Sequence, residues 1–521
     1  MDYKKYYPFE LTEEQKELVD ELLDFFESEE DNIFILKGYA GTGKTSIMLG
    51  LVKYLSEMKR PFYLMASTGR ASKVLAEKAL YPASTLHSSI YIMQIVEIPP
   101  HQRKNDDMMY RVGFKLKNSN HSSDTIFFVD ESSMLSNAYQ RGGNFVFGSG
   151  YLLDDFFRFK GPAKVVFIGD PAQLPPVNVK FSAALNKKFL ESNFEPGVRE
   201  FTLKKVMRYS PDSGMNYNTN HLREVITSKN FPPLSIKASG FDDMEVFNHE
   251  NDLIKKYYET IKQSGVDNAI YITFTNKTTS FVNRKVRVHL WGPSKVNQLQ
   301  INESLMVARN NYLYGLNNGD LITVDSIDSK VIKKAGLSFR KITIRVSDPD
   351  PAKGVIVKEV MIIDDLLYSD GRDLSMEQDM DILKNYFGRM SHLAKEIYET
   401  LVAIQHLEAE EQVEKINLLA HEKKVKLDAY SLSQKLPSKN KFIKKMAYDN
   451  MQTDPFLNAL RVKFGYAITC HKAQGSEWEN VFIHFEKSLS YLDRENLYRW
   501  TYTAISRAEK KLHLLNSSFI Y

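Results

Sequence analysis

The residues best suited to chemistry form a glycine-rich run, Gly-Tyr-Ala-Gly-Thr-Gly-Lys-Thr, at positions 38–45. The run matches the pattern G-x-x-x-x-G-K-[ST] and lies between an apolar segment and a helical pattern, as phosphate-binding loops do. Its glycines allow backbone N–H groups to surround phosphates, and the following helix N-terminus adds a favourable field. Lys44 is expected to neutralise the β- and γ-phosphates and Thr45 to ligate Mg²⁺. The predicted nucleotide contacts are Gly38, Ala40, Gly41, Thr42, Gly43, Lys44, Thr45 and Ser46.

Two acidic residues, Asp130 and Glu131, follow an apolar segment at 125–129. In a domain with a phosphate-binding loop, this pair suits metal-assisted hydrolysis. Asp130 would hold Mg²⁺ through water, and Glu131 would orient and deprotonate the attacking water. Another apolar segment, at 164–168, ends in a turn with Gln173, whose amide could hydrogen-bond the γ-phosphate or the attacking water. A plain proline-rich turn explains Gln173 equally well.

The elements that position these residues alternate between strand and helix. Apolar runs at 32–36, 62–66, 125–129 and 164–168 are rich in β-branched and aromatic residues. Such runs predict strands buried on both faces of a parallel sheet. Helical patterns at 12–26, 45–58 and 71–80 separate them, and Thr12 with Gln15 has the spacing of a capping box. The alternation is typical of a doubly wound α/β domain.

The rest of the chain predicts a second α/β unit and two interruptions. Residues 88–123 have two β-prone arms around a Pro-Pro centre, which indicates a hairpin or small subdomain. The second unit begins near Phe201, with a strand at 268–274 and a helix at 277–290, and resumes at Gly465. Residues 318–346 predict small antiparallel β structure. Residues 375–428 are charged and helical, which a solvated helical hairpin would explain.

Composition allows a nucleic-acid partner without requiring one. The chain has 521 residues, a net charge of +4, 28 Tyr and 31 Phe. It contains no apolar run of about 18 residues or more, and its N-terminus lacks the apolar core of a signal peptide, so we expect an intracellular protein with no membrane partner. The single cysteine, Cys470, excludes an intrachain disulfide framework and a Cys-rich zinc module.

Four further stretches resemble superfamily 1 helicases, specifically the branch with RecD-like and phage Dda-like enzymes. They are FVDESSM at 128–134, GDPAQLPP at 169–176, AITCHKAQGSEW at 467–478 and YTAISRA at 502–508. Together the matches run from Gln15 to Arg507 and are highly specific. Residues from about 330 to 455 resemble the family only in placement and general character.

This resemblance implies two RecA-like P-loop NTPase domains with ATP bound between them. The first would occupy residues 1–200, with an inserted pin-like subdomain at about 88–123. The second would occupy residues 201–320 and 456–521. Residues 321–455 would form an inserted SH3-like β domain with a helical extension. Pro99 or Pro100 could be the wedge that splits a duplex, although a surface turn fits them as well.

The resemblance also implies roles for single residues. Gln15 would read the adenine, and Arg208 and Arg507 would reach the γ-phosphate, where arginines stabilise spread phosphoryl charge. Gln474, Gly475 and Glu477 would line the other side of the nucleotide. Relatives often have proline where this chain has Ser67. The expected contacts to a nucleic-acid strand are Ser67, Thr68, Arg70, Thr85, His87, Thr275, Asn276, Thr469, His471 and Lys472.

The function implied by the resemblance is an ATP-dependent DNA helicase that uses Mg²⁺, moves 5′→3′ on single-stranded DNA and unwinds duplex DNA. The direction follows from the resemblance alone. We expect a cytoplasmic monomer, in a bacterial cell or a phage-infected host, that engages single-stranded DNA and duplex forks. Replication or single-strand-binding proteins are further expected partners. The alternatives are an RNA helicase of the same superfamily and a nucleic-acid-binding ATPase switch that does not unwind.

Overall fold

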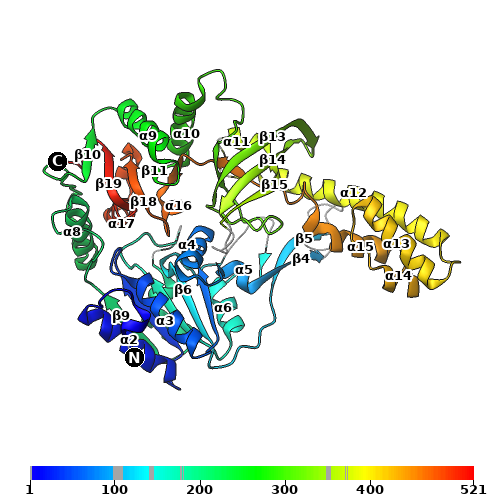
Figure 1. The fold of residues 1–521 in the computed structure, drawn as a ribbon, viewed down its shortest axis with the longest axis horizontal. Helices are drawn as coiled ribbons and strands as arrows, with labels where there is room; N and C mark the ends of the chain where they lie inside the picture. The colour runs from blue at the N-terminus through cyan, green and yellow to red at the C-terminus, as the bar shows by residue number, and fades with distance from the viewer. Residues whose placement is uncertain are drawn as a thin grey trace.

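Four β-sheets and their surrounding helices make up the described part of the chain. The computed structural model describes residues 3–97, 110–139, 146–176, 179, 181–347, 354–369, 371 and 373–521. Figure 1 shows two α/β lobes, a β domain beside them and a helical arm that projects away from the β domain. Both ends of the chain lie on the side of the molecule opposite the arm (Figure 1).

The first lobe is built on a six-stranded sheet in the order β3-β2-β6-β8-β1-β9, and each neighbouring pair is parallel. Side chains of β1 alternate between two cores: Ile33 and Ile35 join one, and Phe34 and Leu36 join the other. A strand with two buried faces needs a continuous apolar run, which is why the sequence predicted these strands. The strands are β1 (Ile33–Gly38), β2 (Phe62–Ala66), β3 (Ala83–Thr85), β6 (Ile126–Asp130), β8 (Lys164–Gly169) and β9 (Val198–Leu203).

Helices cover both faces of this sheet, which confirms the doubly wound α/β prediction. The predicted capping box is present, since Thr12 and the third helical residue, Gln15, bond to each other's backbone N–H groups. The helices of the lobe are α1 (Tyr3–Tyr6), α2 (Glu13–Glu27), α3 (Lys44–Glu57), α4 (Gly69–Ala79), α5 (Leu86–Ile90), α6 (Leu152–Lys160) and α7 (Lys187–Asn193).

The expected boundary between residues 200 and 201 needs correction, because it falls inside β9. That strand pairs in parallel with β1, from Ile33 beside Val198 to Gly38 beside Leu203. As an edge strand it buries only Val198 and Leu203 fully, so its sequence lacks the continuous apolar run of the inner strands. The first lobe therefore extends to Leu203.

The second lobe has a five-stranded parallel sheet in the order β10-β19-β18-β11-β17. Every residue of β11 is buried, as expected of an inner strand. The strands are β10 (Met244–Phe247), β11 (Ala269–Thr273), β17 (Ala467–Thr469), β18 (Trp478–Ile483) and β19 (Ala508–Leu515). The helices are α8 (Gly214–Ser228), α9 (Glu250–Ser264), α10 (Asn276–Trp291), α16 (Cys470–Ala473) and α17 (Arg494–Ile505).

The β domain is an antiparallel sheet in the order β15-β14-β13-β12-β16. Two of its strands, β12 and β16, lie outside the expected range of 321–455. They belong to this sheet because β12 pairs with both β13 and β16. Both chain connections of the domain therefore join it to the second lobe. The elements are β12 (Ser304–Val307), β13 (Leu321–Lys334), β14 (Leu337–Ser347), β15 (Val355–Ile363), α11 (Asp364–Tyr368) and β16 (Val462–Phe464).

The helical arm has a hydrophobic core of its own, which includes Ile397, Ile416 and Phe442. Residues 375–428 are thus part of a packed helical unit and not a hairpin solvated on all sides. The helices of the arm are α12 (Met376–Ala403), α13 (Ala409–Lys423), α14 (Ala429–Gln434) and α15 (Lys439–Asn450). Among the helices of the described residues, none has the length and apolar composition needed to cross a membrane.

A small sheet interrupts the first lobe where the pin-like subdomain was expected. The strands β4 (Tyr91–Glu97) and β5 (Tyr110–Leu116) pair antiparallel, and β7 (Val146–Phe147) adds to β5. We call these three strands the hairpin unit. The proposed wedge residues, Pro99 and Pro100, lie outside the described residues.

Candidate active site

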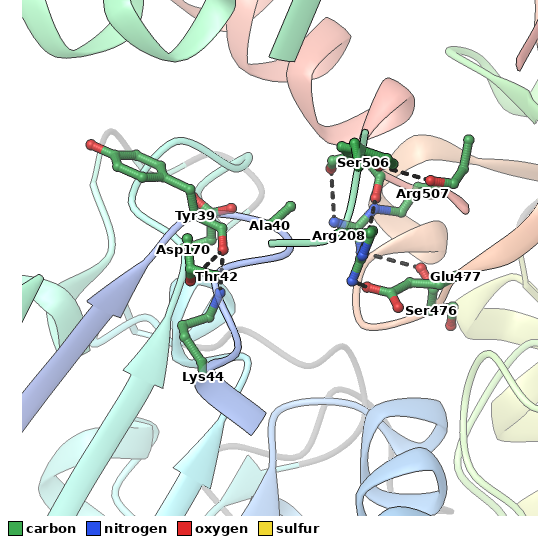
Figure 2. A network of polar contacts seen from close by, with 12 residues as sticks. Tyr39, Ala40, Thr42, Lys44, Asp170, Arg208, Ser476, Glu477, Ser506 and Arg507 are labelled. Atoms are coloured by element: carbon green, nitrogen blue, oxygen red, sulfur yellow. Dashed lines mark hydrogen bonds and ion pairs between the residues drawn. The ribbon is translucent and has the colours of Figure 1, made fainter. Parts of the chain in front are cut away.

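The phosphate-binding loop connects β1 to the first turn of α3. Gly41 and Gly43 have φ of +77° and +87°, a region that glycine adopts without steric cost. No side chain caps α3, so N–H groups of its first turn, including those of Thr45 and Ser46, remain available to an anion. Lys44 turns back and donates from Nζ to the carbonyl oxygen of Tyr39 at 2.9 Å (Figure 2).

Neighbouring segments lie tightly against this loop. A Cβ on Gly41 would lie 2.6 Å from the Cβ of Arg208, and one on Gly43 would lie 2.8 Å from Nε2 of Gln15. The Gln15 amide donates to the carbonyl oxygen of Thr42 at 3.2 Å. The loop glycines therefore permit both the phosphate cradle and the close approach of two predicted nucleotide contacts.

The acidic pair lies at the end of β6, beside the loop. The backbone N–H of Glu131 donates to Oδ1 of Asp130 at 2.8 Å. Glu131 has φ of +51°, an uncommon conformation for a residue with a side chain and one that tends to occur at functional sites. Burial, helped by the neighbouring Asp130 charge and opposed by Arg507 and Lys44, raises the pKa of Glu131 to about 7. Burial also raises the pKa of Asp130, against the hydrogen bond from Glu131.

The two arginines meet Glu477 and the backbone of the second lobe. Arg208 forms an ion pair with Glu477 and donates to the carbonyl oxygen of Ser506 at 3.3 Å (Figure 2). Arg507 is buried and donates to the carbonyl oxygens of Thr503 and Ser476, at 3.0 and 3.2 Å. These bonds hold both guanidinium groups on the second lobe. Each group has five N–H donors, so donors remain that could contact a phosphate.

Gln173 and Gln474 face the boundary between the lobes from opposite sides. The Gln474 amide donates to the carbonyl oxygen of Leu174 at 3.0 Å, and the Gln173 amide lies 3.5 Å from Oδ2 of Asp170. Within the described residues, the Oε1 atoms of both glutamines are buried without a hydrogen-bond partner. Buried acceptors without a partner are rare in proteins, so these two oxygens are available to a ligand or water.

Two predicted residues are part of the contact between the lobes. Gly475 has φ of +74°, and a Cβ there would lie 2.8 Å from the Cβ of Ala71 and 3.4 Å from Cγ of Glu131. Arg70 lies over the ring of Trp478 at 4.4 Å, and burial lowers its pKa to about 10. Arg70 was expected to bind the nucleic-acid strand. The structure instead places it against the aromatic face of the second lobe.

Tyr502, which the sequence did not single out, bridges the phosphate-binding loop and Asp170. Its hydroxyl accepts from the N–H of Ala40 at 3.0 Å and donates to Oδ2 of Asp170 at 2.7 Å. We expect Tyr502→Phe to lower the free energy of unfolding by about 1–3 kcal/mol, because the buried N–H of Ala40 loses this acceptor and the buried carboxylate of Asp170 loses one of its hydrogen bonds. Urea unfolding measures this loss.

The matched control is Tyr498→Phe on the same helix, whose hydroxyl donates at 3.4 Å to the carbonyl oxygen of Pro233. It should change the free energy of unfolding by well under about 1 kcal/mol, since a bond of that length contributes little. Equal losses in the two variants would contradict the bridging role of Tyr502.

Four of the five strand-contacting residues predicted for the first lobe meet at one cavity of about 580 Å³, and Arg70 does not line it. This cavity, which we call cavity A, is also lined by the hairpin unit, the β domain and the base of the arm. The four predicted residues along its wall are Ser67, Thr68, Thr85 and His87. The residues that sequence reasoning missed there include Phe114, Arg309, Asn310, Tyr312 and Asn318. The polar and aromatic run RNNYLYGLNNG at 309–319 was the available signal.

The corresponding residues of the second lobe meet at a smaller cavity of about 170 Å³, cavity B. Asn276, Thr469 and Lys472 line it together with Arg284 and, from the β domain, Lys463. Thr275 and His471 are absent from its lining, although each is adjacent in sequence to a residue that lines it. The side chain of Thr275 is bound to Glu486 at 2.9 Å.

Three of the predicted threonines are helix caps. Thr68, Thr85 and Thr275 each accept a hydrogen bond from a backbone N–H in the first turn of α4, α5 and α10, respectively. These hydroxyls fix where the helices begin, which is the usual role of threonine at this position. The hydroxyl oxygen accepts in each cap, so the capping bond itself does not use the O–H donor that a phosphate contact would need.

Comparison with known proteins identifies both ends of the catalytic core. A family model described as an AAA domain matches residues 10–230, and one described as a UvrD-like helicase C-terminal domain matches residues 464–515. The second match contains Glu477 and Arg507. The chain is an ATP-dependent helicase of superfamily 1.

The whole-chain relatives of this helicase are distant. It is 22% identical to the uncharacterized protein R530 of Acanthamoeba polyphaga mimivirus, over 96% of this chain and 98% of that protein. It is 24% identical to the RecBCD subunit RecD of Buchnera aphidicola, over 94% of this chain and 71% of that protein.

Solved Pif1 helicases align along nearly the whole helicase chain. A Bacteroides Pif1 complex with ADP-AlF3 and single-stranded DNA is 16% identical, with a TM-score of 0.44, over 98% of this chain and 94% of that chain. The Candida albicans Pif1 structure is also 16% identical, with a TM-score of 0.41, over 98% and 95% of the two chains. The two family models, with the motifs they contain, place the chain in its superfamily.

Proposed function

We propose that this helicase moves 5′→3′ along single-stranded DNA and unwinds duplex DNA as ATP opens and closes the cleft between its lobes. The observation that carries the proposal is the pair of cavities A and B. Each gathers predicted strand contacts of one lobe, and the β domain forms part of the wall of both. A strand that occupied both cavities would be held by both lobes, as a motor that steps along a backbone requires.

The cleft has the donors that Mg²⁺ and the nucleotide require. Mg²⁺ prefers one or two protein oxygens together with substrate phosphates and water. Thr45 and Asp130 supply a hydroxyl and a carboxylate, and in the described residues no cluster of three or more His, Cys, Asp or Glu forms an all-protein site. We propose that these two residues hold Mg²⁺, which would neutralise phosphate charge when bound. Glu131 would accept the proton of the attacking water.

The direction of movement follows from the similarity to RecD-like and Dda-like enzymes, and tailed duplexes test it. We expect unwinding of a duplex with a 5′ single-stranded tail and little unwinding of the same duplex with a 3′ tail. Gel separation of the labelled strand after addition of ATP and Mg²⁺ measures both. Unwinding of only the 3′-tailed duplex would reverse the proposed direction. Hydrolysis without unwinding of either substrate would favour an ATPase switch.

The choice of DNA over RNA is tested by hydrolysis. We expect single-stranded DNA to stimulate turnover more strongly than RNA of the same sequence and length. The comparison uses saturating ATP and a titration of each strand, so that affinity and maximal stimulation are separated. Stronger maximal stimulation by RNA would favour the RNA helicase alternative.

A further inference from the structure

The outer part of the helical arm has segregated charge. Residues 396–422 carry a series of glutamates and the single lysine Lys415; the glutamates are Glu396, Glu399, Glu408, Glu410, Glu411, Glu414 and Glu422. Residues 423–445 carry the single acid Asp428 and a series of lysines; these are Lys423, Lys424, Lys426, Lys435, Lys439, Lys441, Lys444 and Lys445. We call this second segment the basic end of the arm. A chain with an overall charge of only +4 therefore concentrates positive charge in one segment of its sequence.

Most of this charge faces solvent, because the opposite side of the helices is fixed in the arm core. Phe442 and Met446 of α15 are buried in that core, while Lys441 and Lys445 lie on the exposed face. Lys424, Lys426 and Lys435 are exposed as well. The ion pairs found on the basic end join Lys423 to Glu396 and Glu422, and Lys439 to Glu399. Like charges four residues apart on a helix destabilise it slightly, so a negatively charged partner would relieve this repulsion.

The base of the arm is anchored beside the hairpin unit. Leu383 and Met451 share one hydrophobic cluster with Tyr91 and Phe114 of the hairpin unit. Arg389 of α12 binds Asp454 through two hydrogen bonds, of 2.9 and 3.0 Å, which holds the base rigidly. The basic end projects outward from this anchor, beyond β4 and β5 (Figure 1). The arm is therefore attached beside the hairpin unit.

We propose that the basic end of the arm binds the phosphate backbone of duplex DNA ahead of the point of strand separation. The inference rests on the proposed function, since it places the fork at the hairpin unit. Duplex DNA carries one negative charge per about 1.7 Å of its axis. The 12-residue helix α15 is about 18 Å long, which is roughly half of a ~34 Å helical turn of the duplex.

A single strand fits the basic end less well than a duplex does. Seven of the ten residues predicted to bind a strand line cavities A and B, and the arm contributes to cavity A only with residues of its base. Flexible lysines on exposed helices suit sequence-independent contact with the closely spaced phosphates of a duplex. Such contacts would add affinity for the fork without reading its sequence.

The test compares two DNA probes on the triple variant Lys435→Ala/Lys441→Ala/Lys445→Ala. One probe is a 5′ single strand, and the other carries the same strand as the tail of a duplex. We expect the Kd for the tailed duplex to rise about tenfold or more at low salt, with the slope of log K against log[KCl] smaller in magnitude by about 2–3. The Kd for the single strand and the strand-stimulated ATPase should stay within about twofold. Fluorescence anisotropy over a KCl series measures binding.

The control is the triple variant Lys255→Ala/Lys262→Ala/Lys510→Ala, which removes the same charge from exposed positions of the second lobe. It should leave the affinity for both probes nearly unchanged. Equal weakening of both probes by the arm variant would assign its lysines to the single strand and overturn the proposal. Unchanged binding of both probes would overturn it too, and would favour an acidic protein partner.

Two further measurements separate the possible failures. Thermal unfolding checks that the arm variant keeps its fold, and Lys435→Arg/Lys441→Arg/Lys445→Arg should retain duplex affinity because the charge remains. A wild-type protein that lacks strand-stimulated ATPase would contradict the proposed function itself. In contrast, a wild-type protein with normal ATPase and no gain in affinity from the duplex would contradict only the role of the arm.

Discussion

Glu131→Gln is expected to lower the strand-stimulated turnover of ATP by about 10²–10⁴-fold, the usual contribution of a positioned general base. The amide keeps the size of the side chain and cannot accept the proton. Nucleotide affinity should change little, because the phosphate-binding loop is intact. A coupled assay for ADP gives turnover, and a fluorescent nucleotide gives Kd. Full strand-stimulated turnover in this variant would refute the assignment of Glu131 as the base.

The raised pKa of Glu131 also predicts how activity depends on pH. The kcat/KM of the wild type should rise about tenfold per pH unit below pH 7 and level off above it, since this ratio reports the free enzyme and the base must be ionised. Glu131→Gln should lose this rise. The control is Glu200→Gln, on the surface of the same lobe, where Glu200 pairs with Lys37 at 2.7 Å. It should retain the wild-type turnover and profile.

The same shift has an opposite effect on stability. Because the pKa is raised from 4.5 to about 7, the folded protein holds a proton that the unfolded chain has released between these two pH values. Glu131 therefore lowers the free energy of unfolding as pH rises through this window. Glu131→Gln removes this contribution. The Tm of the variant minus the Tm of the wild type should therefore increase from pH 5 to pH 8. A Tm difference that does not change with pH would contradict the shift.

Lys44→Ala is expected to lower ATP turnover by about a hundredfold to a thousandfold, because it removes a charge placed to stabilise the phosphates as the reaction proceeds. In the protein, Lys44 makes one hydrogen bond to the carbonyl oxygen of Tyr39. Its loss should cost no more than about 1.5 kcal/mol of stability. Circular dichroism should therefore show the wild-type fold.

Lys53→Ala is the matched control, since Lys53 is exposed on the same helix, α3. It should keep wild-type turnover and nucleotide affinity. If Lys44→Ala lost its helical signal, or if both variants lost activity equally, the loss could not be attributed to phosphate charge. Near-normal turnover in Lys44→Ala would place the phosphates elsewhere.

Local patterns explain which parts of the site could be predicted. The loop, β1 and the acidic pair are specified by adjacent residues: glycines at turn positions, then an apolar run, then charges at the strand end. The ion-pair partner of Arg208 and the partner of the Tyr502 hydroxyl are not local. Arg208 meets Glu477, 269 positions along the chain, and Tyr502 meets Ala40, 462 positions away. One sequence records no distance of this kind, so the bridging role of Tyr502 could not be foreseen.

The same limit explains the differences in the fold. The edge strand β9 shows no continuous apolar run, so its membership of the first sheet depends on its pairing with β1.

The threonines at strand ends were predicted to bind phosphates because a hydroxyl suits that role. It equally suits the cap of the next helix, which is where Thr68 and Thr85 are found. Residue type alone does not separate the two.

The β domain is joined to the second lobe through both of its chain connections, and this has a mechanical consequence. The domain also shares one hydrophobic cluster with that lobe, since Leu305 and Ile342 lie in the same cluster as Tyr271, so we expect the two to move together. Contacts of the β domain with the first lobe would then absorb relative motion of the two lobes. Among these contacts are the 2.8 Å ion pair of Lys73 with Asp320 and the close approach of Asn317 to Gly69, where a Cβ would lie 1.8 Å from that of Asn317. Cavity A lies beside these contacts, so its width would change with the separation of the two lobes.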